Sequence, residues 1–172
     1  MLAALREALE FEFGLSSGIG HFSFSFDNAF DPHRNQYNAT HLWRQVLSAR
    51  EGSFHKVLVV TDYDLFVPVL TFVFGEAQLG GRAGIVSACR LHQSFYELPS
   101  DDGLLFMRLL KETIHEIGHL YGLRHCYTPG CVMGPSTAIE GVDLKSKKFC
   151  VECLQAFAHA REVLLEQLQD KG

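Results

Sequence analysis

The chain has 172 residues, 47% of them hydrophobic, and a formal net charge of −5. This length and composition suit one domain with a sizeable core, and the mixed charges exclude a basic surface for nucleic acid or an anionic membrane. The longest strongly apolar stretch, residues 65–75, is interrupted by Pro68 and is too short to span a bilayer. We therefore expect a single domain over residues 1–172, a monomer that binds neither nucleic acid nor membrane.

The N-terminal sequence MLAALREALE predicts an amphipathic helix over residues 2–12. Arg6, Glu7 and Glu10 interrupt any apolar run, so the segment does not have the pattern of a signal peptide. We expect a cytoplasmic location, where clustered cysteines favour metal binding over disulfides. Without a secretory signal, the triplet Asn38-Ala39-Thr40 carries little weight as a glycosylation site.

The first half of the chain is predicted to mix strands and helices. The alternation in residues 21–26, HFSFSF, is typical of a half-buried strand, whereas residues 27–38, rich in Asp, Asn and Pro, predict a loop. Thr40 is expected to cap a helix that runs to about Arg50. Short apolar runs predict three further strands, over residues 56–61, 69–74 and 83–88.

A long amphipathic helix is predicted to begin near residues 99–102 and to end at Gly122, in a left-handed turn. Its apolar residues recur at spacings of three or four and should face the core. They are Phe106, Leu110, Ile114, Ile117 and Tyr121. An irregular stretch with turn residues follows, and a final helix is predicted over about residues 152–169. Cys89 is expected to be an ordinary buried thiol in or beside a strand.

The long helix carries a candidate metal site in the string HEIGHLYGLRH, residues 115–125. His115 and His119 are four apart and project from one helical face, which suits two zinc–nitrogen bonds of roughly 2 Å. Gly122 lets the chain turn and bring back His125 as a third ligand, so the fourth position stays open. Glu116, beside the first ligand, is placed to hold a zinc-bound water without being a ligand itself.

A bare HExxH on an amphipathic helix is a weak motif that arises by accident. The glycine and the third histidine at fixed spacing argue against accident, although a histidine site without hydrolytic activity stays open. The pattern HExxHxxGxxH followed by a methionine resembles the metzincin metalloproteases. The resemblance implies that Met133 is the methionine of their Met-turn, packed beneath the zinc histidines; the alternative is that Met133 is ordinary core filler.

Four cysteines predict a second, structural zinc site. Cys126 and Cys131 are separated by four residues, and Cys150 and Cys153 by two, with eighteen residues between the pairs. Two short-spaced pairs of this kind are a strong signature of a closed four-cysteine zinc site. The alternatives are four unrelated buried thiols, or disulfides, which require an oxidising compartment.

Taken together, HEIGHLYGLRHC, CVM and FCVEC closely resemble the archaemetzincin family. The stretches RNQYNAT, TDYDLFVP and FGEAQLGGRAGIVS are also similar to that family. The resemblance implies an α+β fold with a twisted mixed sheet and an active-site helix over about residues 1–122, followed by a small zinc-stapled subdomain over about 123–172. Two departures are sixteen residues between Met133 and Cys150, where about seventeen are expected, and the lack of a strand before Leu2.

The predicted function is hydrolysis of peptide bonds by a zinc metallopeptidase that uses two zinc ions, one catalytic and one structural. Glu116 is the predicted general base, and the substrate is a peptide or protein. The strand over residues 83–87 is one candidate for a sheet edge that pairs with an extended substrate; the alternative is an ordinary sheet strand. A zinc-stapled module that binds peptides without cutting them is the alternative function, against which Glu116 argues.

Overall fold

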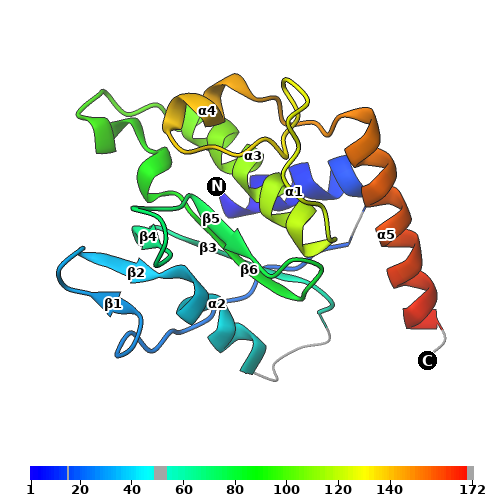
Figure 1. Cartoon of the computed structure of the whole chain (residues 1–172), viewed down its shortest axis with the longest axis horizontal. Helices are drawn as coiled ribbons and strands as arrows, with labels where there is room; N and C mark the ends of the chain where they lie inside the picture. The colour runs from blue at the N-terminus through cyan, green and yellow to red at the C-terminus, as the bar shows by residue number, and fades with distance from the viewer. Residues whose placement is uncertain (15, 49–53, 170–172) are drawn as a thin grey trace.

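The computed structural model describes residues 1–14, 16–48 and 54–169, arranged as Figure 1 shows. The longer helices are α1 (Leu2–Phe13), α2 (Ala39–Ser48), α3 (Asp102–Leu120) and α5 (Val151–Gln169); α4 (Ile139–Leu144) is short, and η1 (Cys89–Leu91) and η2 (Gln93–Tyr96) are 3-10 turns. Within the described ranges, no helix is long and apolar enough to cross a bilayer.

The main sheet is mixed and has three strands. Its central strand, β6 (Ala83–Ser87), pairs in parallel with β3 (Val57–Thr61) and antiparallel with β5 (Gly75–Ala77). The prediction that β6 is a sheet edge is therefore wrong. Both neighbours come from apolar or glycine-containing runs whose place in the sheet depends on distant pairing, which local sequence does not reveal.

A second, smaller sheet has the order β1 (Phe30–Asp31), β2 (Gln36–Asn38) and β4 (Leu65–Phe66). It includes an antiparallel hairpin within the predicted loop 27–38. The Asp31 carboxylate accepts hydrogen bonds from the backbone N–H groups of His33 and Arg34 at 2.9 and 3.3 Å, and Asn35 has a φ of 53°. Turn-forming residues here close a hairpin, so the loop prediction was partly wrong.

Helices cover both faces of the main sheet, with α2 on one face and α3 on the other (Figure 1). The alternation along β6 explains this arrangement. Ala83 and Ile85 belong to the core beneath α2, whereas Val86 belongs to the core formed with α1, α3 and α5. The strand is buried at every position, as expected for a strand covered on both sides. The prediction of an α+β fold with a mixed sheet and an active-site helix is confirmed.

Helix α3 begins and ends as its sequence predicts. The Asp101 carboxylate accepts a hydrogen bond from the Leu104 N–H at 2.9 Å and so caps the first turn. At the other end Gly122 has a φ of 89°, and the Leu123 N–H returns to the Gly118 carbonyl at 3.0 Å. This reversal carries the chain back toward the helix just after His119 and before His125.

Two predicted strands are absent. In segment 21–26 the Gln45 side chain hydrogen bonds to the N–H and the carbonyl of Ser25, at 2.9 and 2.8 Å, and no strand pairs with the segment in the described structure. Residues 69–74 turn after Pro68 and contribute only a bridge between Val73 and Leu65. The strands form on either side of that segment, as β4 and β5.

The predicted cap of α2 also needs correction. The Asn38 carboxamide, rather than Thr40, accepts the hydrogen bond from the His41 N–H at the start of α2, and the Thr40 hydroxyl binds Glu76. The predicted end of α2 near Arg50 lies outside the described residues. The stretch predicted to be irregular contains α4, whereas α5 confirms the final helix. Cys89 is half-buried in η1, just after β6.

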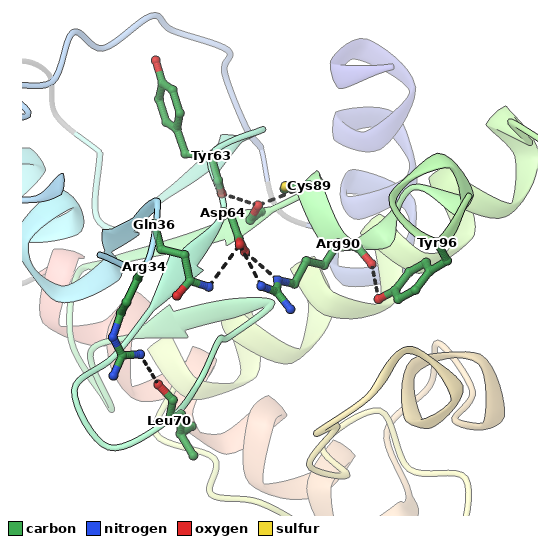
Figure 2. A network of polar contacts seen from close by, with 9 residues as sticks. Arg34, Gln36, Tyr63, Asp64, Leu70, Cys89, Arg90 and Tyr96 are labelled. Carbon is green, nitrogen blue, oxygen red and sulfur yellow. Dashed lines mark hydrogen bonds and ion pairs between the residues drawn. The ribbon is translucent and has the colours of Figure 1, made fainter. Parts of the chain in front are cut away.

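Polar contacts fix the loop that leads into β5, as Figure 2 shows. Arg90 donates two hydrogen bonds to the Asp64 carboxylate, at 2.6 and 2.8 Å, and Gln36 donates a third at 3.0 Å. The Arg90 guanidinium also lies 4.2 Å from the Phe72 ring centroid. β5 begins three residues after Phe72, so the contact between Arg90 and Phe72 holds the loop close to the strand that lies beside the candidate site.

Candidate metal centre and active site

His115 and His119 face each other across one turn of α3. Their Nε2 atoms are 3.0 Å apart, while each Nδ1 contacts a backbone carbonyl: that of Val132 at 2.8 Å and that of Leu123 at 2.7 Å. A carbonyl can only accept, so both Nδ1 atoms carry the proton and both Nε2 atoms present lone pairs. Two nitrogens bound to one zinc at about 2.0–2.1 Å would lie about 3.3 Å apart, close to the separation observed.

His125 completes the cluster from beyond the Gly122 turn. Its ring centroid lies 5.3 Å from that of His115 and 5.0 Å from that of His119, and the three rings offer ligand atoms within 4.8 Å of one another. His115 is buried, His119 half-buried and His125 exposed. The cluster is therefore held from the helix side and open to solvent on the side of His125, as a site that admits a substrate requires.

Glu116 is buried beside the cluster and faces β5. Its side chain is 3% exposed, and its Oε2 has no hydrogen-bond partner in the described part of the chain. A Cβ built on Gly75 would lie 2.6 Å from Oε1, so only glycine lets the strand approach this closely. Gly75 lies in the stretch FGEA, where no local sequence pattern ties it to a helix forty residues later, so its role could not be predicted.

Met133 lies directly beneath the histidine-bearing turn. It is fully buried, and a Cβ on Gly118 would overlap its Sδ, so the thioether packs against the helix backbone between His115 and His119. The preceding residue, Val132, supplies the carbonyl that orients His115. The segment after the first cysteine pair therefore packs against the helix beneath His115 and His119.

Burial decides the protonation of these groups. It lowers the pKa of His115 well below its usual range, and also lowers the pKa values of His119 and His125, so the rings stay neutral as metal ligands must. Burial likewise raises the pKa of Glu116 well above the usual value, reinforced by the nearby Glu112 carboxylate. A dication bound in the histidine cluster would lower the pKa of Glu116 again and favour its ionised carboxylate.

The four cysteines form a second cluster. Ligand sulfurs from Cys126, Cys131, Cys150 and Cys153 lie within 4.8 Å of one another, and Cys126 Sγ is 3.8 Å from Cys150 Sγ. That distance is far beyond a disulfide bond of about 2.05 Å and close to the edge of a tetrahedron around zinc with bonds of about 2.3 Å. All four are thiols, and hydrogen bonds from Thr128 lower the pKa of Cys126 to about 7. The donor set suits a closed zinc site.

Two cavities lie apart from the histidines. One of about 1740 Å³ lies against α1, β3 and residues 16–24, and α3 lines it through Thr113, Ile117 and Leu120 rather than through the histidines or Glu116. The other, of about 290 Å³, adjoins Cys126 and Cys131. The candidate active site is therefore the open face beside His125 and β5, where the three histidines and Glu116 lie.

A buried acid beside converging imidazoles, on a helix that packs against a mixed sheet, defines the class of protein: a zinc metallopeptidase. The profile of Peptidase family M54 matches residues 11–159. The chain belongs to this family.

Curated relatives agree with the family. The chain is 40% identical over 144 residues to the archaemetzincin of Methanocaldococcus jannaschii, covering 84% of this chain and 72% of the relative. It is 40% identical over 161 residues to that of Pyrococcus furiosus, covering 90% and 84%. The predicted assignment to the archaemetzincins and to the metallopeptidases is confirmed.

Solved structures agree as well. An archaemetzincin from Methanopyrus kandleri superposes with a TM-score of 0.84 at 33% identity, covering 94% of this chain and 86% of that one. A zinc-dependent peptidase from Methanocorpusculum labreanum superposes with a TM-score of 0.78 at 34% identity, covering 90% and 91%.

Proposed function

We propose that the chain hydrolyses peptide bonds with a zinc ion held by His115, His119 and His125, and with Glu116 as the general base. One observation carries the proposal: the two helical imidazoles direct unprotonated Nε2 atoms at one point, beside a buried carboxylate oxygen that has no hydrogen-bond partner among the described residues. A module that only bound zinc would have no use for that acid, because an unpaired buried carboxyl is costly.

When bound, zinc supplies Lewis acidity, which lowers the pKa of a water toward about 7 and polarises a carbonyl. The residues of the chain move the proton. Glu116 accepts it from the attacking water at Oε2 and then delivers it to the leaving amine. The Nδ1 hydrogen bonds of His115 and His119 keep both rings in the orientation and tautomer that the ion needs.

The substrate is a peptide or protein, bound as an extended strand. β5 pairs with β6 on one side, and its other edge has no strand partner among the described residues. Gly75 on this strand touches Glu116, so a peptide paired with the edge of β5 would pass beside the base. We propose that β5, and not the central strand β6, performs the substrate pairing.

Cys126, Cys131, Cys150 and Cys153 hold a second zinc ion, which is structural. Four thiolates close this site, whereas three imidazoles leave the other open. Mild chelation should therefore leave about one zinc per chain, measured by elemental analysis. Equal loss of both ions would count against two distinct sites. Free thiols at this spacing also fit a reducing, cytoplasmic compartment.

Replacing Glu116 tests the mechanism. Glu116→Ala should keep both metals and the fold, and should slow cleavage of a peptide library by roughly two to four orders of magnitude, the worth of a general base. Glu166→Ala, an exposed glutamate on α5, is the matched control and should cleave like wild type. A peptide-binding module predicts no cleavage by either variant or by wild type. Undiminished cleavage by Glu116→Ala would refute the role of Glu116.

A further inference from the structure

Two ion pairs join α3 to the end of α4. Arg108 donates to both carboxylate oxygens of Asp143 at 2.8 and 2.6 Å. One helical turn later, Lys145 Nζ lies 2.7 Å from Glu112 Oε1. The first pair reaches the surface, because the Asp143 side chain is 38% exposed, but the side chains of Lys145 and Glu112 are only 6% and 5% exposed.

The buried pair is not explained by stability. Removing two charges from water costs several kcal/mol per ion, and apolar residues of similar volume are often as stabilising as such a pair. The contact is an ion pair rather than a well-aligned hydrogen bond, since Glu112 Oε1 lacks a hydrogen-bond partner among the described residues. Because burying the ammonium costs this much free energy, we expect a further role for Lys145.

The other contact of Lys145 suggests that role. Its Nζ donates to the carbonyl of Gly134 at 3.2 Å. Gly134 is the last of three consecutive residues, of which the first two contact α3. The carbonyl of Val132 accepts a hydrogen bond from His115 Nδ1, and the sulfur of Met133 packs against Gly118. The ammonium therefore ties α3, through Glu112, to the three residues that orient His115 and support the turn between His115 and His119.

We propose that Lys145 is a positioning residue for the three-histidine metal site: by bridging Glu112 and the Gly134 carbonyl it fixes residues 132–134 beneath the ligands. It touches neither substrate nor metal, because it is buried against Glu112 and Gly134. The proposal rests on the proposed three-histidine site. Loss of an outer partner of a ligating histidine typically weakens metal binding or activity by 10–100-fold.

The test replaces zinc with cobalt in the histidine site while the four-cysteine site keeps its zinc. Lys145→Met should change the visible cobalt spectrum, weaken metal binding at this site by about 10–100-fold, and lower kcat more than it raises KM. The matched control is Lys147→Met, which removes a partly exposed lysine paired with Glu12 on α1. It should leave spectrum, affinity and kcat unchanged.

A second variant separates positioning from folding. Glu112→Gln combined with Lys145→Met leaves no unpaired buried charge, so it should melt near wild type and still show the altered spectrum, because the bond to Gly134 is gone. A wild-type spectrum and affinity in either variant would overturn the proposal. So would unfolding of the double variant, which would make Lys145 a residue of the fold. If wild type itself bound no cobalt through histidine, the proposed function would fail instead.

Discussion

Met133 packs its sulfur against Gly118, in the turn of α3 between His115 and His119. A side chain at position 118 would occupy the space that the thioether fills. Gly118→Ala should therefore displace Met133, lower peptidase activity and destabilise the protein by about 1–3 kcal/mol, the usual effect of overpacking. Thermal melts and cleavage rates measure the two effects.

The control for Gly118→Ala is Gly103→Ala in the first turn of the same helix. There a Cβ would meet only the capping Asp101 carboxylate, at 3.3 Å, a contact that a shift of a few tenths of an ångström relieves. Alanine should be neutral or stabilising by up to about 1 kcal/mol, because glycine is the weaker helix former. Equal melting temperatures and rates for the two variants would show that the space beside Gly118 does not matter.

Gly75→Ala should impair Glu116 without removing a ligand. The new Cβ would lie 2.6 Å from Oε1, so the carboxylate must move away from β5. We expect kcat to fall by about tenfold or more, while elemental analysis still finds the same zinc content, because a small displacement of a catalytic group is costly. Loss of zinc along with activity would mean that Gly75 supports the ligands rather than the base.

Cys150→Ser should loosen the C-terminal part of the chain. The four cysteines join the segment that follows the third histidine to the start of α5, and structural zinc contributes on the order of 10 kcal/mol. The variant should lose the tightly held zinc, and hydrogen exchange should accelerate from Cys126 onward. The half-buried Cys89 lies outside the cluster, so Cys89→Ser is the control and should retain that zinc. A wild-type melt for Cys150→Ser would exclude a structural role.

Local spacing was enough to predict both clusters. His115, Glu116 and His119 lie within one turn and a half of a single helix, so the helical period alone sets their geometry. The return of His125 needed only one further signal, a glycine able to adopt the left-handed turn. The two short spacings between cysteines predicted the four-cysteine cluster in the same way.

Contacts between distant segments could not be predicted. Gly75 meets Glu116, and Lys145 meets Glu112, across stretches of chain whose path depends on tertiary packing. The place of β6 in the sheet could not be predicted for the same reason, because only its pairing with β3 and β5 makes it the central strand. Apolar and polar residues do alternate in segment 21–26, which was predicted to be a strand. Its backbone, however, hydrogen bonds to the Gln45 side chain instead of to a neighbouring strand.

Burial lowers the pKa of His115 well below 6.5 in the folded chain, so after removal of the metal from the histidine site alone the folded state binds fewer protons than the unfolded state as pH falls through 6.5. By linkage, this stability is present above the unfolded pKa and is lost toward the lowered one. The protein that retains only its four-cysteine zinc should therefore melt at progressively lower temperature between about pH 6.5 and 5, and His115→Asn should reduce this slope.

With metal bound, the same lowered pKa values mean that zinc is released from the histidine site only at lower pH. The lowered pKa values of His115, His119 and His125 favour the neutral rings, so the open site should hold zinc in mildly acid solution and lose it only further below, before the chain unfolds. Dialysis across this range followed by elemental analysis and a far-ultraviolet spectrum separates release from unfolding. Both zinc ions and full activity retained near about pH 4 would contradict imidazole ligation, because protons outcompete zinc for histidine at that acidity.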